Sequence, residues 1–508
     1  MSALDASVVE GRTLSGAHRL TCDVVVVGTG AAGATVAVTL ADAGWDVVML
    51  EEGARLRESE FTANLWKTMK TLFRDLGASF LEGRSFIPVL QGRCVGGGTV
   101  INSAIVWRVP EDVHGVWLRR DPGLSAGIPY ADLERHWAVL ERDLGVAPTD
   151  DAIRGHNSRL LALAAERLGY RGRVIPRNVV GCEGQALCLQ GCPNGRKQST
   201  AVTYVPRALR AGARLFTDAR VDRVVTEGGR ASGVQATLLG GDPERPATLE
   251  VTARRAVVLA ASALQSPGIL LKSGLDRLGP VGQHFMCHPG VSMVGVYDAP
   301  VDLWSGATQG YEIDHFRPER MKIESIALPP ELMALRMPGV GQKLARWLPL
   351  ARHMALWGAQ VRSRAEGQVR LGGTGVRVRF TQTAEDLVTI RLGLRVCAEA
   401  CFASGARSVL PGIHGLPEEL TSMDEVTRWL DRVTDVRQLN MIATHLFGTL
   451  RMGTHPDDAV VNPFGEAHRL PRLYVADSSV FPSNLGVNPQ HTIMGVARQI
   501  AEHVLARA

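Results

Sequence analysis

Hydrophobic residues near the start of the chain follow a pattern that predicts a strand, a helix and a second strand. Val24 to Val27 form a continuous β-branched run, which is typical of a strand buried on both faces. Small residues then continue through a helical stretch that ends near Gly44, and the sequence DVVMLEE after it predicts another strand. The segment from Cys22 to Gly53 is therefore predicted to be a β-α-β unit.

The turn between the first strand and the helix contains Gly28, Gly30 and Gly33. Backbone N–H groups at a helix N-terminus can approach a pyrophosphate closely only where no Cβ stands in the way. Glu51 lies at the end of the second strand, 18 residues past Gly33, where a carboxylate can accept hydrogen bonds from ribose hydroxyls. We predict dinucleotide binding, and this motif alone does not separate FAD from NAD.

Composition and charge exclude several other classes of function. With 508 residues, 45% hydrophobic and 21% charged, the chain can form two domains with sizeable cores. The net charge of +5 is not gathered into a basic block, so nucleic-acid binding is not predicted. No apolar run approaches the ~18 residues that span a bilayer. Asp5 and Glu10 interrupt the first twenty residues, which lack the apolar core of a secretory signal, so we expect a soluble, cytoplasmic protein.

Three further segments accompany the β-α-β unit. Residues 92–110 read GRCVGGGTVINSAIVWRVP, residues 257–275 read VVLAASALQSPGILLKSGL, and residues 445–453 read HLFGTLRMG. In this order and with these separations, the motifs closely resemble the glucose–methanol–choline oxidoreductase family, whose members bind FAD. The resemblance extends from about Cys22 to the C-terminus.

The resemblance implies an α/β fold with two domains. One is a Rossmann-like, discontinuous FAD-binding domain, and the other is an α+β substrate domain with an antiparallel sheet. The expected FAD-binding pieces are residues 20–114, 200–290 and 436–508, and the expected substrate-domain pieces are residues 115–199 and 291–435. Because the match is loose in the substrate-domain pieces, the substrate is the least determined feature.

The same resemblance implies which residues surround FAD. The expected cofactor-binding residues are Gly28, Gly30, Gly33 and Glu51 at the ADP half, Gly96, Gly97, Thr99 and Asn102 along the pyrophosphate and flavin, Val221 beside the adenine, and Asp477 on a late strand. For Asp477, capping of the following turn is the alternative interpretation. Some family members tether FAD covalently through a histidine. Ile101 holds the matching position and cannot form that bond, so non-covalent FAD is expected.

Oxidation of an alcohol by hydride transfer to the flavin N5 requires a base beside the hydroxyl oxygen. His445 matches the family's catalytic histidine, and a histidine pKa of ~6.5 suits proton uptake near neutral pH. A second group, His or Asn in this family, holds the same oxygen. Asn488 matches the Asn version, whose amide NH₂ can donate a hydrogen bond, and Pro489 then starts a helix.

His491 complicates this assignment because it follows Asn488 by three residues, about one helical turn. It is a candidate for the pocket or for the catalytic partner itself, and a purely structural role is the other alternative. His284 and His288, in the sequence GQHFMCHP, are expected to pack near the flavin domain rather than to bind a metal.

Cys182, Cys188 and Cys192 form a C-x5-C-x3-C-P pattern. The pattern resembles the three-cysteine segment of flavin dehydrogenase subunits that carry a three-iron cluster and pass electrons to a cytochrome, although the first gap there is one residue shorter. Reduced structural thiols in a glycine-rich turn are the competing and favoured interpretation. A zinc site lacks an obvious fourth ligand, and a disulfide does not suit a reducing compartment.

The function implied by the resemblance is FAD-dependent oxidation of a CH–OH group to a carbonyl. Sugars, amino sugars, sterols and long-chain alcohols are all candidate substrates, and the electron acceptor is oxygen, a quinone-like carrier or a redox protein. A flavin-bound lyase of the same fold is the alternative from another enzyme class, and a flavin and iron–sulfur dehydrogenase subunit is a third. Reduction of the flavin by substrate without oxygen would separate a dehydrogenase or oxidase from the lyase.

Overall fold

The valine run predicted as a strand lies in the middle of a large sheet. In the computed structural model, which describes residues 6–242, 244–373 and 375–507, the run belongs to strand β2 (Ala17–Val27). Strand β2 pairs in parallel with β3 (Val47–Leu50) on one side and with β12 (Thr248–Leu259) on the other. Helix α2 (Ala31–Asp42) connects β2 to β3, as predicted. The four valines are buried because the sheet continues on both sides and both faces are covered.

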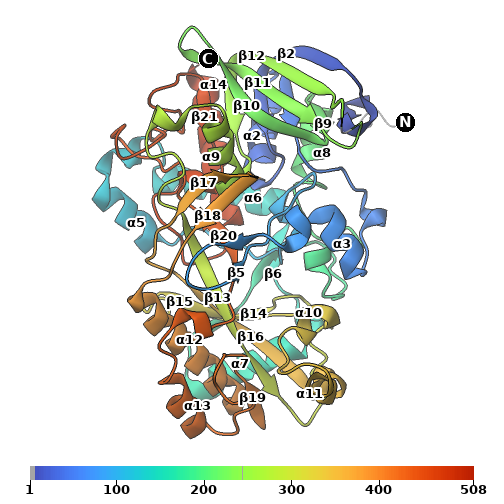
Figure 1. The fold of residues 1–508 in the computed structure, drawn as a ribbon, viewed down its shortest axis with the longest axis vertical. Helices are drawn as coiled ribbons and strands as arrows, with labels where there is room; N and C mark the ends of the chain where they lie inside the picture. The colour runs from blue at the N-terminus through green and yellow to red at the C-terminus, as the bar shows by residue number, and fades with distance from the viewer. Residues whose placement is uncertain (1–5, 243, 374, 508) are drawn as a thin grey trace.

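Within the described ranges, this first sheet has eight strands and lies at the top of Figure 1, near both chain ends. Its strands, in spatial order, are β1 (Val8–Glu10), β9 (Arg214–Thr217), β3, β2, β12, β11 (Arg230–Leu238) and β10 (Ala219–Glu227), with β21 (Leu473–Val475) also paired to β12. The part from β1 to β12, together with β21, is parallel, whereas β10 and β11 form an antiparallel extension. The predicted α/β fold class is confirmed.

Two helices near the expected domain boundary at residue 115 pack with the first sheet. Helices α5 (Glu111–Arg120) and α6 (Tyr130–Asp143) contribute the fully buried Trp117 and Trp137 to the core of this sheet. Helix α6 lies against α14 (Gln490–Arg507), which also packs on α2. The apolar face of α6 is therefore covered by the C-terminal helix, and Trp117 of α5 stacks on Phe481.

The second sheet lies below the first in Figure 1 and is antiparallel throughout. Its strands are β19 (Ser408–Leu410), β13 (Met286–Val296), β16 (Met354–Val361), β15 (Met321–Ser325), β14 (Tyr311–Ile313) and β7 (Gly172–Val174), with β20 (Ile442–Phe447) also paired to β13. Helices α12 (Ala384–Ala403) and α7 (His156–Leu168) pack against it and against each other. The predicted antiparallel sheet of the second domain is confirmed.

Strand β20 carries His445 and was expected among the pieces of the FAD-binding domain. It pairs with β13 in the second sheet, in the register Met286 with Phe447 and Cys287 with Leu446. This pairing places a residue of the late flavin-binding segment on the sheet of the other domain. Strand β20 is therefore a strand of the second sheet and lies against helix α9 (Ser262–Lys272).

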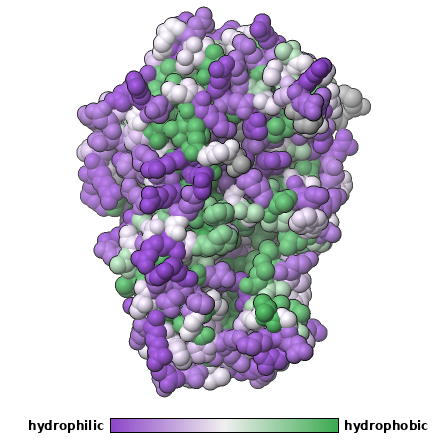
Figure 2. Space-filling view, in the orientation of Figure 1, coloured by the Kyte–Doolittle hydropathy of each residue, from purple (hydrophilic) through white to green (hydrophobic). Residues whose placement is uncertain are grey.

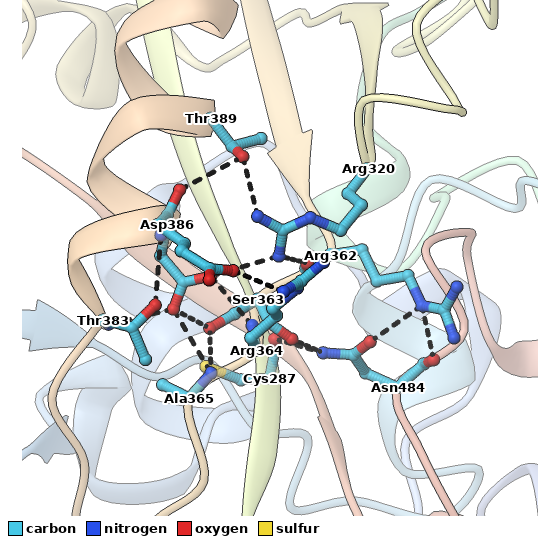
Figure 3. A network of polar contacts seen from close by, with 11 residues as sticks. Cys287, Arg320, Arg362, Ser363, Arg364, Ala365, Thr383, Asp386, Thr389 and Asn484 are labelled. Carbon is cyan, nitrogen blue, oxygen red and sulfur yellow. Dashed lines mark hydrogen bonds and ion pairs between the residues drawn. The ribbon is translucent and has the colours of Figure 1, made fainter.

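A buried polar network fastens the loop before Asn488 to the second sheet (Figure 3). Asn484 donates through Nδ2 to the backbone oxygens of Ser363 at 2.7 Å and Cys287 at 3.3 Å. Ser363 in turn donates to Asp386, a fully buried residue at the start of α12. Asp386 also accepts hydrogen bonds from three backbone N–H groups, those of Arg364, Ala365 and Thr383.

No helix among the described residues is both long enough and apolar enough to cross a membrane.

We predict that Asp386→Ala strongly destabilises the protein, because three backbone N–H groups and the Ser363 hydroxyl lose their hydrogen bonds to a buried carboxylate. Hydrogen bonds to charged groups contribute about 1.5–3 kcal/mol each, so the free energy of unfolding should fall by at least about 3 kcal/mol. The neighbouring Glu385, whose side chain is 60% exposed, provides the control. Glu385→Ala should change the free energy of unfolding by no more than about 0.5 kcal/mol. Equal loss in both variants on denaturant unfolding would contradict this account.

Candidate active site

Two glycines of the first loop are closely surrounded by protein atoms, and the third borders open space. Gly28 has φ +99°, and a Cβ there would lie 2.5 Å from the carbonyl oxygen of Ala260. A Cβ on Gly33 would lie 1.9 Å from the carbonyl oxygen of Gly28. A Cβ on Gly30 would meet no protein atom within 4 Å. Gly28 and Gly33 are thus required by protein packing, whereas Gly30 borders open space at the N-terminus of α2.

The second glycine loop is joined to the first by hydrogen bonds through threonine hydroxyls. The N–H of Gly96 donates to Oγ1 of Thr29 at 3.0 Å, and Thr200 donates to the carbonyl oxygen of Thr29 at 3.0 Å. Thr99 and Thr200 share a hydrogen bond of 3.0 Å between their hydroxyls. A Cβ on Gly97 would lie 3.1 Å from Cα of Gly30. The predicted residues of the two loops therefore lie side by side.

Glu51 links the end of β3 to the first loop. Its carboxylate accepts hydrogen bonds from the N–H and hydroxyl of Thr29, at 3.0 and 2.7 Å, and from the N–H of Gly53 at 3.0 Å. Burial raises the pKa of Glu51, and the hydrogen bonds from Gly53 and Thr29 oppose that rise. A carboxylate has about four acceptor positions, so one is left for a ribose hydroxyl.

Asp477 follows β21 and is occupied by protein donors. It accepts hydrogen bonds from the N–H of Ser262 at 3.0 Å, the hydroxyl of Ser266 at 2.5 Å and the N–H of Ser479 at 2.9 Å. The bond from Ser479 is the turn cap considered as the alternative from sequence. Val221 lies buried on β10 at the edge of the same sheet. Asp477 thus holds the start of helix α9 (Ser262–Lys272) against the late strand.

These residues fit a dinucleotide. Gly30 and Gly98 both face space in which a Cβ would meet no atom within 4 Å, and Gly97 lies between them. The N-terminus of α2 directs its free N–H groups into the same region, which suits a pyrophosphate. Ile101 is buried and offers no nucleophile for a covalent flavin bond.

His445 lies half-buried on β20, with a second histidine behind it. Its Nδ1 lies 3.2 Å from Nδ1 of His288 on β13, and the two rings are nearly perpendicular, at 89°. Burial, with a smaller contribution from the charge of Lys322, lowers the pKa of His445 to about 3. His445 is therefore neutral near pH 7, and its Nε2 is the nitrogen not occupied by His288.

His288 was expected only to pack near the flavin domain, yet it contacts the candidate base. Its Nε2 accepts a hydrogen bond from the N–H of Gly486 at 2.9 Å. An acceptor at Nε2 places the hydrogen of neutral His288 on Nδ1, from which it can donate to Nδ1 of His445. In that form the hydrogen of neutral His445 is on Nε2. If neutral His445 carries its hydrogen on Nδ1 instead, its Nε2 has a free lone pair.

Asn488 stands directly before Pro489 and α14, as predicted, and is 8% exposed. Its Oδ1 accepts a hydrogen bond of 2.6 Å from Nζ of Lys322 on β15. The next helix residue, Gln490, accepts a hydrogen bond from Nδ2 of Asn102 in the second glycine loop. Asn488 is thus held between that loop and the second sheet.

Sequence reasoning missed Lys322 and its partners. The ammonium group is fully buried and donates to Glu312 at 2.7 Å and to Glu324 at 2.5 Å, as well as to Asn488. The available signal was the alternation in MKIES, residues 321–325, which puts Lys322 and Glu324 on one face of a strand. Three buried charges next to a candidate catalytic residue are unusual in an otherwise apolar sheet.

His491 faces α6 rather than an open pocket. Its side chain is fully buried, and its Nε2 lies 3.5 Å from Oε1 of Glu141. Its backbone oxygen accepts a hydrogen bond from Nε1 of Trp137. Burial would raise the pKa of Glu141, but the nearby His491 and Arg108 lower it to about 2. This placement supports the structural alternative for His491 over a place in the pocket.

The three cysteines lie in separate surroundings. Cys188 is buried and accepts a hydrogen bond of 2.9 Å from Nη2 of Arg177, whereas Cys192 accepts one from the backbone N–H of Lys197. Cys182 is partly exposed. Over the part of the chain that the structure describes, no group of three His, Cys, Asp or Glu side chains is arranged to hold a metal ion. Structural thiols and an iron–sulfur cluster therefore both stay predictions for this segment.

The cysteine segment is connected to the second glycine loop by hydrogen bonds from one lysine. Nζ of the buried Lys197 donates to the carbonyl oxygens of Val100 and Cys188, both at 2.5 Å, and of Asn102 at 2.9 Å. Burial lowers the pKa of Lys197 to about 8, which still leaves it mostly charged at neutral pH. Lys197 therefore ties the cysteine segment to the loop expected to lie along the flavin.

Comparison with known families gives two matches. The model of the N-terminal part of GMC oxidoreductases matches residues 22–290, and the model of the C-terminal part matches residues 363–497.

Individual relatives extend the comparison. An uncharacterized GMC-type oxidoreductase of Mycobacterium tuberculosis is 38% identical over 487 residues, covering 96% of this chain and 76% of the relative. A long-chain-alcohol oxidase of Arabidopsis thaliana is 27% identical over 519 residues, covering 96% of this chain and 69% of the relative. The solved structure of pyridoxine 4-oxidase from Mesorbium loti superposes with a TM-score of 0.72 at 19% identity, covering 96% of this chain and all of that one.

We predict that Gly30→Ala removes cofactor binding without damaging the fold. The added methyl group meets no protein atom, and the backbone at Gly30, with φ −65°, suits alanine. It would, however, stand where a pyrophosphate must approach. The flavin content of the purified variant should fall at least 10-fold while thermal unfolding of the flavin-free protein stays unchanged. Gly115→Ala on α5 is the control and should keep full flavin content. A normal flavin content in Gly30→Ala would contradict the assignment.

Proposed function

The chain belongs to the GMC oxidoreductase family, and we propose that it binds FAD non-covalently and oxidises a CH–OH group of an alcohol to a carbonyl. The observation that carries the proposal is that Asn488 is linked to the candidate base on one side and to the second glycine loop on the other. Lys322 donates to Asn488 and is, after burial, the second cause of the low pKa of His445. Gln490, two residues after Asn488, accepts a hydrogen bond from Asn102 of the second loop. A redox cofactor and a pair of oxygen-binding groups would thus share one site.

The residues proposed to hold FAD are those of the two loops. The N–H groups at the start of α2, together with Gly30 and Gly97, would bind the pyrophosphate, and the remaining acceptor position of Glu51 would bind the ribose. Val221 and Asp477 are proposed near the adenine and along the late strand. Bound FAD supplies the acceptor for the hydride that leaves the alcohol carbon.

His445 is proposed to take the hydroxyl proton at Nε2, and Asn488 to donate from Nδ2 to the same oxygen. The pKa of about 3 keeps the imidazole neutral, which is the form able to accept a proton. A neutral amide donor stabilises the negative charge that develops on the oxygen as the proton leaves.

The His288 contact adds a condition to this step. Neutral His445 can accept at Nε2 only when its hydrogen is on Nδ1, and neutral His288 must then carry its own hydrogen on Nε2. That form leaves the Gly486 amide, which otherwise donates to Nε2 of His288, without its acceptor, at a cost of about 1–3 kcal/mol. Proton uptake by His445 is therefore coupled to His288.

The proposed substrate is a primary alcohol with a long aliphatic chain. The hairpin of β4 (Phe80–Leu81) and β5 (Ile87–Pro88) lies beside β20 and exposes Phe80 and Phe86, with ring centroids 5.3 Å apart. Ile442, three residues before His445, is also exposed. Figure 2 shows hydrophobic side chains gathered around a hollow in the middle of this face. The similarity to the Arabidopsis long-chain-alcohol oxidase supports the same substrate class.

The test of the proposal is reduction of the bound flavin by 1-dodecanol without oxygen. We predict that His445→Ala keeps its flavin but slows this reduction at least ~100-fold, because general-base catalysis contributes that much. His455→Ala provides the control, because His455 is largely exposed and lies outside the site. Absorbance at the flavin maximum, followed after rapid anaerobic mixing, gives the rate.

Other outcomes of this experiment identify the rivals. Reduction by glucose or an amino sugar in place of 1-dodecanol would replace the substrate class and keep the reaction. An oxidised flavin that no alcohol reduces would favour the lyase. Stoichiometric iron in the purified protein would favour the iron–sulfur dehydrogenase subunit, whose acceptor is a redox protein rather than oxygen or a quinone-like carrier.

The low pKa of His445 predicts where activity is lost in acid. A base must be neutral, and a pKa of about 3 keeps His445 neutral well below the pKa of ordinary histidine. The acid limb of kcat/KM, which reports the free enzyme, should therefore lie below about pH 5. Measurement of kcat/KM from pH 4.5 to 8 checks this. A half-maximal value near pH 6.5 would show that His445 titrates as an exposed histidine.

A further inference from the structure

Lys322 stands behind Asn488 with all three hydrogens of its ammonium group engaged. They point to Oε2 of Glu312, Oε1 of Glu324 and Oδ1 of Asn488, at 2.7, 2.5 and 2.6 Å. An ammonium group has three donors and no acceptor, so it has no hydrogen left for another partner. The group is thus fixed in rotation as well as in position.

We propose that Lys322 is a positioning residue that turns the amide of Asn488 so that its Nδ2 faces the substrate oxygen. This inference rests on the proposed function. If the amide were reversed, N–H groups of Asn488 would face the N–H groups of Lys322, and no acceptor would lie between them. Lys322 therefore selects one of the two orientations of the amide.

The register of the second sheet explains why the lysine is held so firmly. Glu312 on β14 lies directly opposite Glu324 on β15, and Lys322 lies two residues before Glu324 on the same face. Side chains in these cross-strand and alternate positions are neighbours. The three charged groups thus converge because two short antiparallel strands pair in this register.

Two further residues bind Glu312. Arg173 on β7 donates to Oε1 of Glu312 at 2.7 Å, and Trp107 donates to Oε2 of Glu312 at 3.0 Å. The charged group therefore contains two cations, Lys322 and the partly exposed Arg173, and two anions, Glu312 and Glu324. Although burial acts in the opposite direction, the two carboxylates raise the pKa of Lys322 and keep it charged. Because the group is neutral as a whole, its main effect on Asn488 is orientation.

Lys322 also lies within electrostatic reach of the candidate base. Its positive charge contributes to the lowered pKa of both His445 and His288. The lysine that holds Asn488 is therefore also near the pair of histidines, which contact each other.

The test is a double-mutant cycle with Asn488→His, since an imidazole at this position donates without needing Lys322 to orient it. Lys322→Met alone leaves two buried carboxylates without their cation and threatens folding, so Lys322→Met/Glu324→Gln is the main variant. This double variant removes one positive and one negative charge. Lys343→Met, at an exposed lysine of the same domain, is the matched control. The holoenzymes are mixed anaerobically with 1-dodecanol and the flavin reduction rate is measured at saturation.

We expect Lys322→Met/Glu324→Gln to slow flavin reduction at least 10-fold, with less than a 3-fold change in the alcohol concentration that gives half the maximal rate. Combined with Asn488→His, the same pair of changes should cost less than 3-fold relative to Asn488→His alone. Equal costs in both backgrounds would show a merely structural role and overturn the inference. Lys343→Met should leave the rate unchanged.

A second readout does not depend on turnover. In protein labelled with ¹⁵N at asparagine, the side-chain amide of Asn488 is assigned by its absence from Asn488→His. It should give one sharp pair of signals in the wild-type holoenzyme and shifted or broadened signals in Lys322→Met/Glu324→Gln. Unchanged signals would overturn the inference even in an active enzyme. A holoenzyme that no alcohol reduces would instead refute the proposed function, and the amide signals would still decide whether Lys322 orients Asn488.

Discussion

Strand β13 is the support on which both candidate catalytic groups depend. His288 on this strand contacts Nδ1 of His445 and accepts a hydrogen bond from the N–H of Gly486. The neighbouring Cys287 accepts through its carbonyl oxygen a hydrogen bond from Asn484, in the loop that leads to Asn488. Strand β20 and the loop before α14 are separate segments of the chain. Both therefore contact adjacent residues of the same strand. Their relative position is set by the sheet rather than by the cofactor.

The polar interior around this strand is better explained by orientation than by stability. Burying a charged group costs free energy that a partner recovers only in good geometry, so a buried ion pair is weak evidence for stabilisation. Lys322 and Glu312 are nevertheless fully buried beside Asn488. Such a charged group holds a side-chain amide in a single orientation. In an apolar core the same amide would be free to reverse. The network of Asp386 and Asn484 does the same for the backbone of the preceding loop.

The sequence was sufficient for the parts of the fold that obey local rules. The valine run lies in a buried strand as predicted, and the glycines of the first loop and Glu51 lie between that strand, its helix and the next strand. Their binding of a cofactor stays a prediction. The packing of α6 could not be predicted from sequence, because its partner is α14, some 350 residues later in the chain, and no local pattern reports that contact.

The parts of the site that were missed are also non-local. His288 acquires its role from the pairing of β13 with β20, and Lys322 acquires its role from the β14–β15 register. The spacing of His491 from Asn488 left both a pocket position and a structural role open, and only the packing against α6 shows that its imidazole lies near Glu141. Periodicity identifies which residues share a face of one element, but not which element that face will meet.

The central claim is that one oxygen of the substrate lies between Nε2 of His445 and Nδ2 of Asn488. A crystal structure of the holoenzyme with a bound long-chain alcohol tests it most directly. The account predicts a hydroxyl oxygen within about 2.6–3.2 Å of both nitrogens, while Oδ1 of Asn488 still accepts from Lys322. An alcohol oxygen bound away from either nitrogen, or an Asn488 amide turned with Oδ1 toward the alcohol, would contradict the account.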